Sequence, residues 1–232
     1  MGKVIMSGIV PQLEEPSSVK PNFADNDWAA IIEACQKNKI PETWVVGDQK
    51  PMTINGTDYT IDIIGKNHDV YSDDSGTAPL TFQMHNCYAT GYAMNDRDPN
   101  YGNYGGWSGC KMRASYLPDI LSKMPSEVQA GIKEVNKLTA AGGGSGTIET
   151  TADKLFLLSD VEVRKTFNSY GGEGTQYAYY AAGNSAVKTI PGTDITYWWL
   201  RSPDMYETAR FCIFNSASQA NNAWGVAFAF CF

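Results

Sequence analysis

The chain has 232 residues, enough for one large domain or for one domain with a short leader. Its 25 acidic residues outnumber 18 basic ones, giving a formal net charge of −7 without a basic run. We therefore expect no nucleic-acid binding, because neutralising phosphates requires clustered Lys and Arg. No apolar stretch approaches the ~20 residues that span a bilayer, and no secretory signal follows Met1. We expect no membrane insertion, and synthesis in the cytoplasm without a Sec signal.

Residues 1–24 form a proline-containing leader that is typical of an extended attachment arm. The domain that follows, residues 25–232, shows no internal repeat or second boundary. Its first half predicts a helix at residues 25–38, capped by Asn26 or Asp27, then strands within residues 44–66 and at 80–84. The dipeptide Asn55-Gly56 predicts a tight hairpin turn between the first two strands.

The second half predicts a loop at residues 96–109, helices at 112–123 and 125–138, and a glycine-rich loop at 140–146. A strand at residues 155–159 and a short helix at 176–182 precede three further strands at 197–201, 210–215 and 224–232. These elements predict an α+β fold, a mainly antiparallel sheet with two flanking helices and neighbouring termini. Residues 204–209 and 216–223 are expected to be loops on a rigid sheet, where binding residues concentrate.

The sequence offers little for metal or nucleophilic chemistry. The five cysteines lack zinc-site spacing, and we expect buried free thiols, although a Cys87–Cys110 or Cys212–Cys231 bridge stays open. His68-Asp69 with the following Asp73-Asp74 could hold a metal, but acidic residues at turn positions are the better interpretation. We expect no metal and no cofactor.

Recognisable motifs lie along residues 26–232. They comprise Ile54-Asn55-Gly56-Thr57-Asp58-Tyr59, Gly65-Lys66-Asn67-His68-Asp69, Leu80-Thr81-Phe82-Gln83-Met84, Gly172-Glu173-Gly174-Thr175-Gln176-Tyr177, Trp198-Trp199-Leu200-Arg201-Ser202-Pro203 and Gly225-Val226-Ala227-Phe228-Ala229-Phe230-Cys231. With them the chain resembles phage and gut-bacterial proteins of C-type-lectin fold, some of which are variable proteins of diversity-generating retroelements.

The resemblance implies a C-type-lectin-like domain that displays a diversifiable binding surface near its C-terminus, on a phage tail or bacterial surface structure. The ligand would be a protein or glycan on a host cell surface. Self-association, or attachment to a larger virion structure through residues 1–24, stays open. By position, the resemblance assigns ligand binding to Leu200, Asp204, Met205, Tyr206, Glu207, Arg210, Cys212, Phe214, Gln219, Asn221, Asn222 and Trp224.

Two alternatives remain at this point. The chain could be a structural tail component without a variable site, or a relative of formylglycine-generating oxidases, which share a related fold and use a close pair of cysteines. Cys212 and Cys231 are separated by 19 positions and form no CxxxxC pattern. We therefore expect a binding module and not an enzyme.

Overall fold

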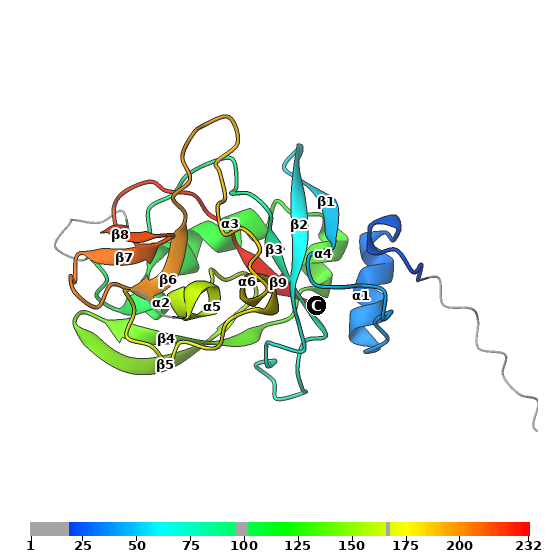
Figure 1. Cartoon of the computed structure of the whole chain (residues 1–232), viewed down its shortest axis with the longest axis horizontal. Helices are drawn as coiled ribbons and strands as arrows, with labels where there is room; N and C mark the ends of the chain where they lie inside the picture. The colour runs from blue at the N-terminus through cyan, green and yellow to red at the C-terminus, as the bar shows by residue number, and fades with distance from the viewer. Residues whose placement is uncertain (1–18, 96–101, 166–167) are drawn as a thin grey trace, which may run out of the picture.

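The computed structural model describes residues 19–95, 102–165 and 168–232 (Figure 1). Most of the expected leader and part of the expected loop at residues 96–109 lie outside these ranges. The described chain is a mixed α/β structure with mostly antiparallel sheets and few helices, in agreement with the coarse prediction.

The main sheet joins the beginning of the domain to its end. Its order is β1 (Gln49–Ile54), β2 (Thr57–Lys66), β3 (Leu80–Met84) and β9 (Ala229–Cys231), with antiparallel neighbours throughout. The predicted hairpin turn is confirmed: Asn55 and Gly56 both have positive φ, at 49° and 76°, which a tight two-residue turn requires. Because β9 lies beside β3, the C-terminal end of the chain is fixed in the middle of the fold.

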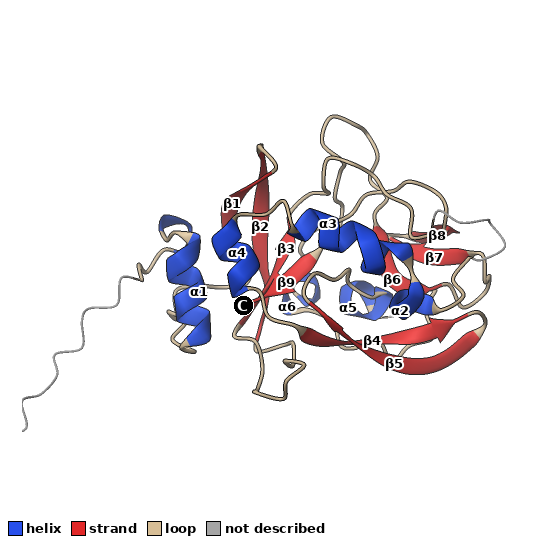
Figure 2. Cartoon of the chain, turned by 180° about the vertical axis from the view of Figure 1, so that it is seen from behind, coloured by secondary structure: helices blue, strands red, loops and turns tan. Residues whose placement is uncertain are grey.

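Helices cover both faces of this sheet (Figure 2). The predicted first helix is confirmed as α1 (Trp28–Gln36), capped by Asp27, whose carboxylate accepts a hydrogen bond from the Ala30 N–H. The Trp28 ring contacts Phe82 of β3 and the last residue, Phe232, at centroid distances of 5.9 and 6.0 Å. Gln83, the neighbour of Phe82, points to the opposite face and accepts a hydrogen bond from the Tyr180 hydroxyl of α6 (Ala178–Ala181).

The segment after residue 125 is the main correction to the predicted elements. Helix α4 (Ser126–Gly131) ends early, and a hairpin of β4 (Val135–Gly142) and β5 (Ser145–Asp153) replaces the expected helix end and glycine-rich loop. The physical reason is a period of two: Val135, Lys137 and Thr139 are buried, while Leu138 between them is exposed. The expected strand at residues 155–159 is reduced to one bridge between Phe156 and Ala229.

A second, three-stranded sheet carries the C-terminal loops. It consists of β6 (Trp199–Pro203), β7 (Arg210–Ile213) and β8 (Ser216–Gln219), with β7 in the centre. The loop at residues 204–209 is confirmed, whereas half of the expected loop at 216–223 is the strand β8. The remaining helical segments are η1 (Phe23–Asp25), α2 (Gly106–Gly109), η2 (Met112–Tyr116), α3 (Leu117–Leu121) and α5 (Asp160–Arg164).

Candidate ligand-binding face

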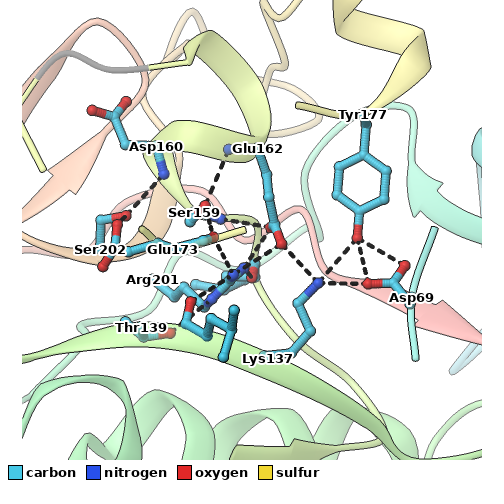
Figure 3. Close-up of polar contacts among 12 residues, drawn as sticks. Asp69, Lys137, Thr139, Ser159, Asp160, Glu162, Glu173, Tyr177, Arg201 and Ser202 are labelled. Carbon is cyan, nitrogen blue, oxygen red and sulfur yellow. Dashed lines mark hydrogen bonds and ion pairs between the residues drawn. The ribbon is translucent and has the colours of Figure 1, made fainter. Parts of the chain in front are cut away.

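A buried network of charges anchors β6, the strand that leads into the expected binding loop (Figure 3). The Arg201 guanidinium binds both carboxylate oxygens of Glu162, with Nη1 2.5 Å from Oε2 and Nη2 2.9 Å from Oε1. The Lys137 ammonium lies 2.8 Å from Glu162 Oε1 and 2.7 Å from Asp69 Oδ1. All four residues are at most 3% exposed. Removing one partner would therefore leave a buried charge without compensation.

Glu162 lies in the first turn of helix α5, and its hydrogen bonds with Ser159 hold it there. The Ser159 hydroxyl accepts a hydrogen bond from the Glu162 N–H, and the Glu162 carboxylate accepts one from the Ser159 N–H. This reciprocal pair is a capping box, whose sequence signature is Ser followed three residues later by Glu. Glu162 was not predicted as a site residue, although this signature could have placed it at a helix start.

The network lowers the pKa of two of its carboxyl groups and raises the pKa of a third. Burial opposes ionisation of Glu162, but Arg201 and Lys137 more than offset it, so the pKa of Glu162 is lowered. Burial opposes ionisation of Asp69 too, and Lys137 again reverses the effect and lowers the pKa. Glu173 accepts hydrogen bonds from the Ser202 hydroxyl and the Ala140 N–H, but burial prevails and raises its pKa.

One group of potential metal ligands lies close together in the described ranges. The ligand atoms of His68, Asp69 and Glu162 are within 4.8 Å of one another. The Lys137 ammonium contacts both carboxylates, so the protein supplies its own cation at this point. The other two acidic candidates, Asp73 and Asp74, are exposed, and Asp73 accepts a hydrogen bond from the Ser75 N–H. The donor set therefore fits a structural ion cluster better than a metal site.

Asn103 fixes the shape of the loop at residues 204–209. Its side chain is fully buried, and its Nδ2 donates to the carbonyl oxygens of Asp204 at 3.2 Å and Arg210 at 2.7 Å, one at each end of the loop. Its Oδ1 accepts a hydrogen bond of 2.8 Å from the Gly143 N–H at the tip of the β4–β5 hairpin. The loop and the hairpin tip are thus held together, and Figure 1 shows them at the same end of the molecule.

The twelve residues assigned to ligand binding differ widely in exposure. Three are half-buried: Arg210, Phe214 and Trp224. The exposed ones are Met205, Tyr206, Glu207, Gln219, Asn221 and Asn222.

Three assignments need correction because the side chains are buried. Leu200 and Cys212 are 0% exposed, and Asp204 is 3% exposed. Leu200 belongs to a strand that is buried along its whole length, and Cys212 lies in the central strand of its sheet. The Asp204 carboxylate turns back and accepts a hydrogen bond from the Tyr206 N–H. These side chains shape the loop and offer no surface to a ligand.

The exposed candidates do not form one continuous face, as we had expected for Tyr206, Arg210, Phe214, Asn222 and Trp224. Arg210 lies opposite Gln219 in the β7–β8 ladder, and Ser218 belongs to the next pair. Neighbouring residues of a strand point to opposite faces, so Ser218 faces away from Arg210. The Trp224 indole and the Asn222 amide both donate to the Ser218 hydroxyl, at 2.7 and 2.8 Å.

Phe214 lies apart from both groups. Its ring stacks on the buried Trp198 at a centroid distance of 6.2 Å, and the Arg164 guanidinium lies 5.9 Å from it. Phe214 therefore belongs to the packing between β7 and α5.

One exposed group combines aromatic and charged side chains at the hairpin end. We call it the tip patch: Tyr104, Met205, Tyr206, Glu207 and Arg210. Tyr104 and Tyr206 are 54% and 71% exposed, and Met205 is 40% exposed. Glu207 and Arg210 form an exposed ion pair of 3.2 Å. Tyr104 was not predicted as a site residue, because only the folded chain brings it to the C-terminal loop.

The backbones of the two segments in this patch touch directly. The Asn103 N–H donates to the Thr208 carbonyl at 2.7 Å, and a Cβ at Gly102 would lie 1.9 Å from that oxygen. Gly102 has a φ of 36°, a value that favours glycine. The close approach requires a residue without a side chain.

All five cysteines are buried and free, so neither bridge left open by the sequence is formed. Burial raises the pKa of Cys35, Cys87 and Cys110 to about 12. Burial also raises the pKa of Cys212 and Cys231. Thiols in such surroundings are poor nucleophiles, because the reactive form is the thiolate.

The described residues form a mixed α/β domain with a buried ionic centre and an exposed loop whose two ends are hydrogen-bonded to Asn103. Residues 86–231 match a protein family described as a domain of unknown function, DUF6273, and the chain belongs to that family. No curated protein and no solved structure matches the chain. Among the described residues, no helix has both the length and the apolar character needed to cross a membrane.

Proposed function

We propose that the chain is a ligand-binding module and that its tip patch contacts the ligand. The observation that carries the proposal is the loop at residues 204–209, which exposes Tyr206 while buried Asn103 fixes its backbone. A rigid loop loses little conformational entropy on binding. Exposed Tyr and Arg are the side chains that most often carry binding energy at interfaces. This combination favours binding over a passive surface.

The finer fold belongs to the same proposal. We infer a C-type-lectin-like fold, and two features support it. The first helix contacts the last residue, so the domain begins and ends in one region. A small separate sheet carries the C-terminal loops away from that region. The motif Trp198-Trp199-Leu200-Arg201-Ser202-Pro203 fits a scaffold role, because its six residues are all buried.

The biological setting is inferred from the resemblance. We propose a receptor-binding or adhesive role on a phage tail or bacterial surface structure, with a protein or glycan ligand on a host cell. Three cavities, of about 230, 330 and 430 Å³, are lined by residues outside the tip patch. The tip patch therefore lines none of these three cavities. It is better suited to a broad contact with a large partner than to a small ligand.

An array of host glycans and surface proteins, screened with the purified chain, tests the binding role. We expect Tyr206→Ala to reduce binding of any hit at least tenfold, since loss of a central aromatic contact costs about 2 kcal/mol. Tyr197→Ala is the matched control, because Tyr197 is 44% exposed but packs on Trp224, which faces away from the tip patch. Equal losses in both variants would contradict the site.

The test also separates the alternatives. Repeated absence of any hit for the wild-type chain would favour a structural tail component. A reverse transcriptase gene and a near-identical template repeat beside the gene would support the diversified form of the proposal. The oxidase alternative has less support, since Cys212 and Cys231 lie in different sheets and burial raises the pKa of both.

A further inference from the structure

The outer edge of β5 is an open strand edge. In an antiparallel pair, residues alternate between those that bond to the partner strand and those whose N–H and C=O point outward. On β4 the outward groups are those of Asn136, Leu138 and Ala140. Their partners in the ladder are Ala152, Thr150 and Ile148, so these three β5 residues point outward on the other edge.

Within the described ranges, the outward backbone groups of the hairpin have hydrogen-bond partners along β4 but mostly not along β5. The outward groups of β4 are bonded inside the protein: the Asn136 N–H donates to Val70, Arg201 donates to the Leu138 carbonyl, and the Ala140 N–H donates to Glu173. On β5, Arg113 covers the Ala152 carbonyl at 3.1 Å.

The outward N–H and C=O groups of Ile148 and Thr150 have no partner among the described residues, and both residues are exposed. Unpaired edge groups of this kind are a template for an added strand.

A cavity lies on the face where the side chains of an added strand would point. It has a volume of about 430 Å³, and its lining includes Val70, Leu138 and Thr150. Leu138 and Thr150 are opposite each other in the ladder and so share one face. A residue placed opposite Thr150 on an added strand would project to the same side. In strand addition, backbone hydrogen bonds provide affinity and pockets that receive side chains provide specificity.

Two of the registers in which two β5 edges could pair with each other are disfavoured. A register centred on Thr150 would place each Ile148 opposite Ala152, where Arg113 already occupies the carbonyl. A register centred on Glu149 would set two carboxylates directly opposite each other, which is destabilising. The edge therefore favours a strand that brings a neutral or basic side chain to Glu149.

We propose that residues 3–10 of a neighbouring copy add to the β5 edge and link the copies. This segment reads Lys3-Val4-Ile5-Met6-Ser7-Gly8-Ile9-Val10: four of its eight residues are β-branched, and its one charge is basic. Its eight residues are one fewer than the nine residues of β5. The chain leaves the domain where the Lys20 carbonyl accepts a hydrogen bond from Trp44, at the α1 end in Figure 1. That end lies opposite the hairpin tip, which favours the edge of another copy.

Disulfide trapping between two full-length variants tests this contact. Ser7→Cys protein is mixed with Thr150→Cys protein under mild oxidation, and cross-linked peptides are identified by mass spectrometry. The native thiols are buried, so they should not compete. Ser7→Cys mixed with Thr57→Cys is the matched control, because Thr57 is an exposed threonine already paired with Ile54. Matching circular dichroism melts establish that each variant is folded.

We expect the 7–150 link in at least fivefold excess over the 7–57 link. Adding Gly8→Glu to the Ser7→Cys protein should lower the 7–150 yield severalfold, because an antiparallel register with Ser7 opposite Thr150 would then set two carboxylates opposite each other at Glu149. A 7–150 yield equal to the control would overturn the proposal. So would a dominant 150–150 link, which would show that the edge pairs with itself. Neither result bears on the tip patch, so the proposed function is tested separately.

Discussion

Replacing Glu162 by Gln should destabilise the fold far more than an ordinary loss of charge. Gln keeps the size of the side chain but removes the charge that Arg201 and Lys137 share. Both cations are at most 2% exposed and would be left with too little negative charge. Breaking a buried ion pair in this way costs about 3–5 kcal/mol. Equilibrium urea unfolding followed by circular dichroism measures the change.

Glu33→Gln provides the matched control. Glu33 pairs with Lys37 one helical turn away, with exposed fractions of 50% and 59% for the two side chains. An exposed pair of this type contributes about 0.3–0.5 kcal/mol. The reasoning would be refuted if Glu162→Gln lost no more stability than Glu33→Gln, because the network would then contribute no more than a surface pair.

The same network predicts how stability depends on pH. The pKa values of Asp69 and Glu162 are lowered in the folded chain, so their contribution is complete above the unfolded values of about 3.9 and 4.3. It is lost as the pH falls through those values toward the folded ones. We expect the wild-type urea midpoint to drop below about pH 4.5, and the drop to be shallower for Glu162→Gln.

Further predictions concern the loop, the core, the thiols and metal. Asn103→Ala should cost about 2–4 kcal/mol, because its short hydrogen bonds to the part-buried backbone of Arg210 and Gly143 are lost, and amide exchange at residues 204–210 should accelerate in mass spectrometry. Trp198→Ala should cost about 3–5 kcal/mol in urea unfolding, whereas Tyr206→Ala should stay within about 0.5 kcal/mol of wild type. The native chain should not react with an aromatic disulfide reagent at pH 8, and a rapid reaction of any thiol would contradict its burial. EDTA should leave the thermal midpoint unchanged, since Lys137 supplies the cation at the His68 cluster; a drop of many degrees would show a structural metal.

Local sequence patterns determined the elements that depend only on residues close together in the chain. The apolar stripe of Trp28, Ile31, Ile32 and Cys35, with Asn26 or Asp27 as a possible cap, predicted the first helix. The dipeptide Asn55-Gly56 predicted the first hairpin. Both depend on contacts within a few residues, so no distant partner could overrule them.

Contacts between distant parts of the chain decided the secondary structure of ambiguous segments and the surface position of single residues. The sequence predicted a helix at residues 125–138, but pairing with β5 and the burial of Lys137 against Asp69 and Glu162 make residues 135–142 a strand. The surface was decided in the same way, because the β7–β8 register turns Trp224 away from Arg210. Tyr104 reached the tip patch only because Asn103 bonds to a loop about a hundred residues further along the chain. A sequence shows which side chains prefer burial or exposure, but which face each one occupies depends on strand register and long-range pairing.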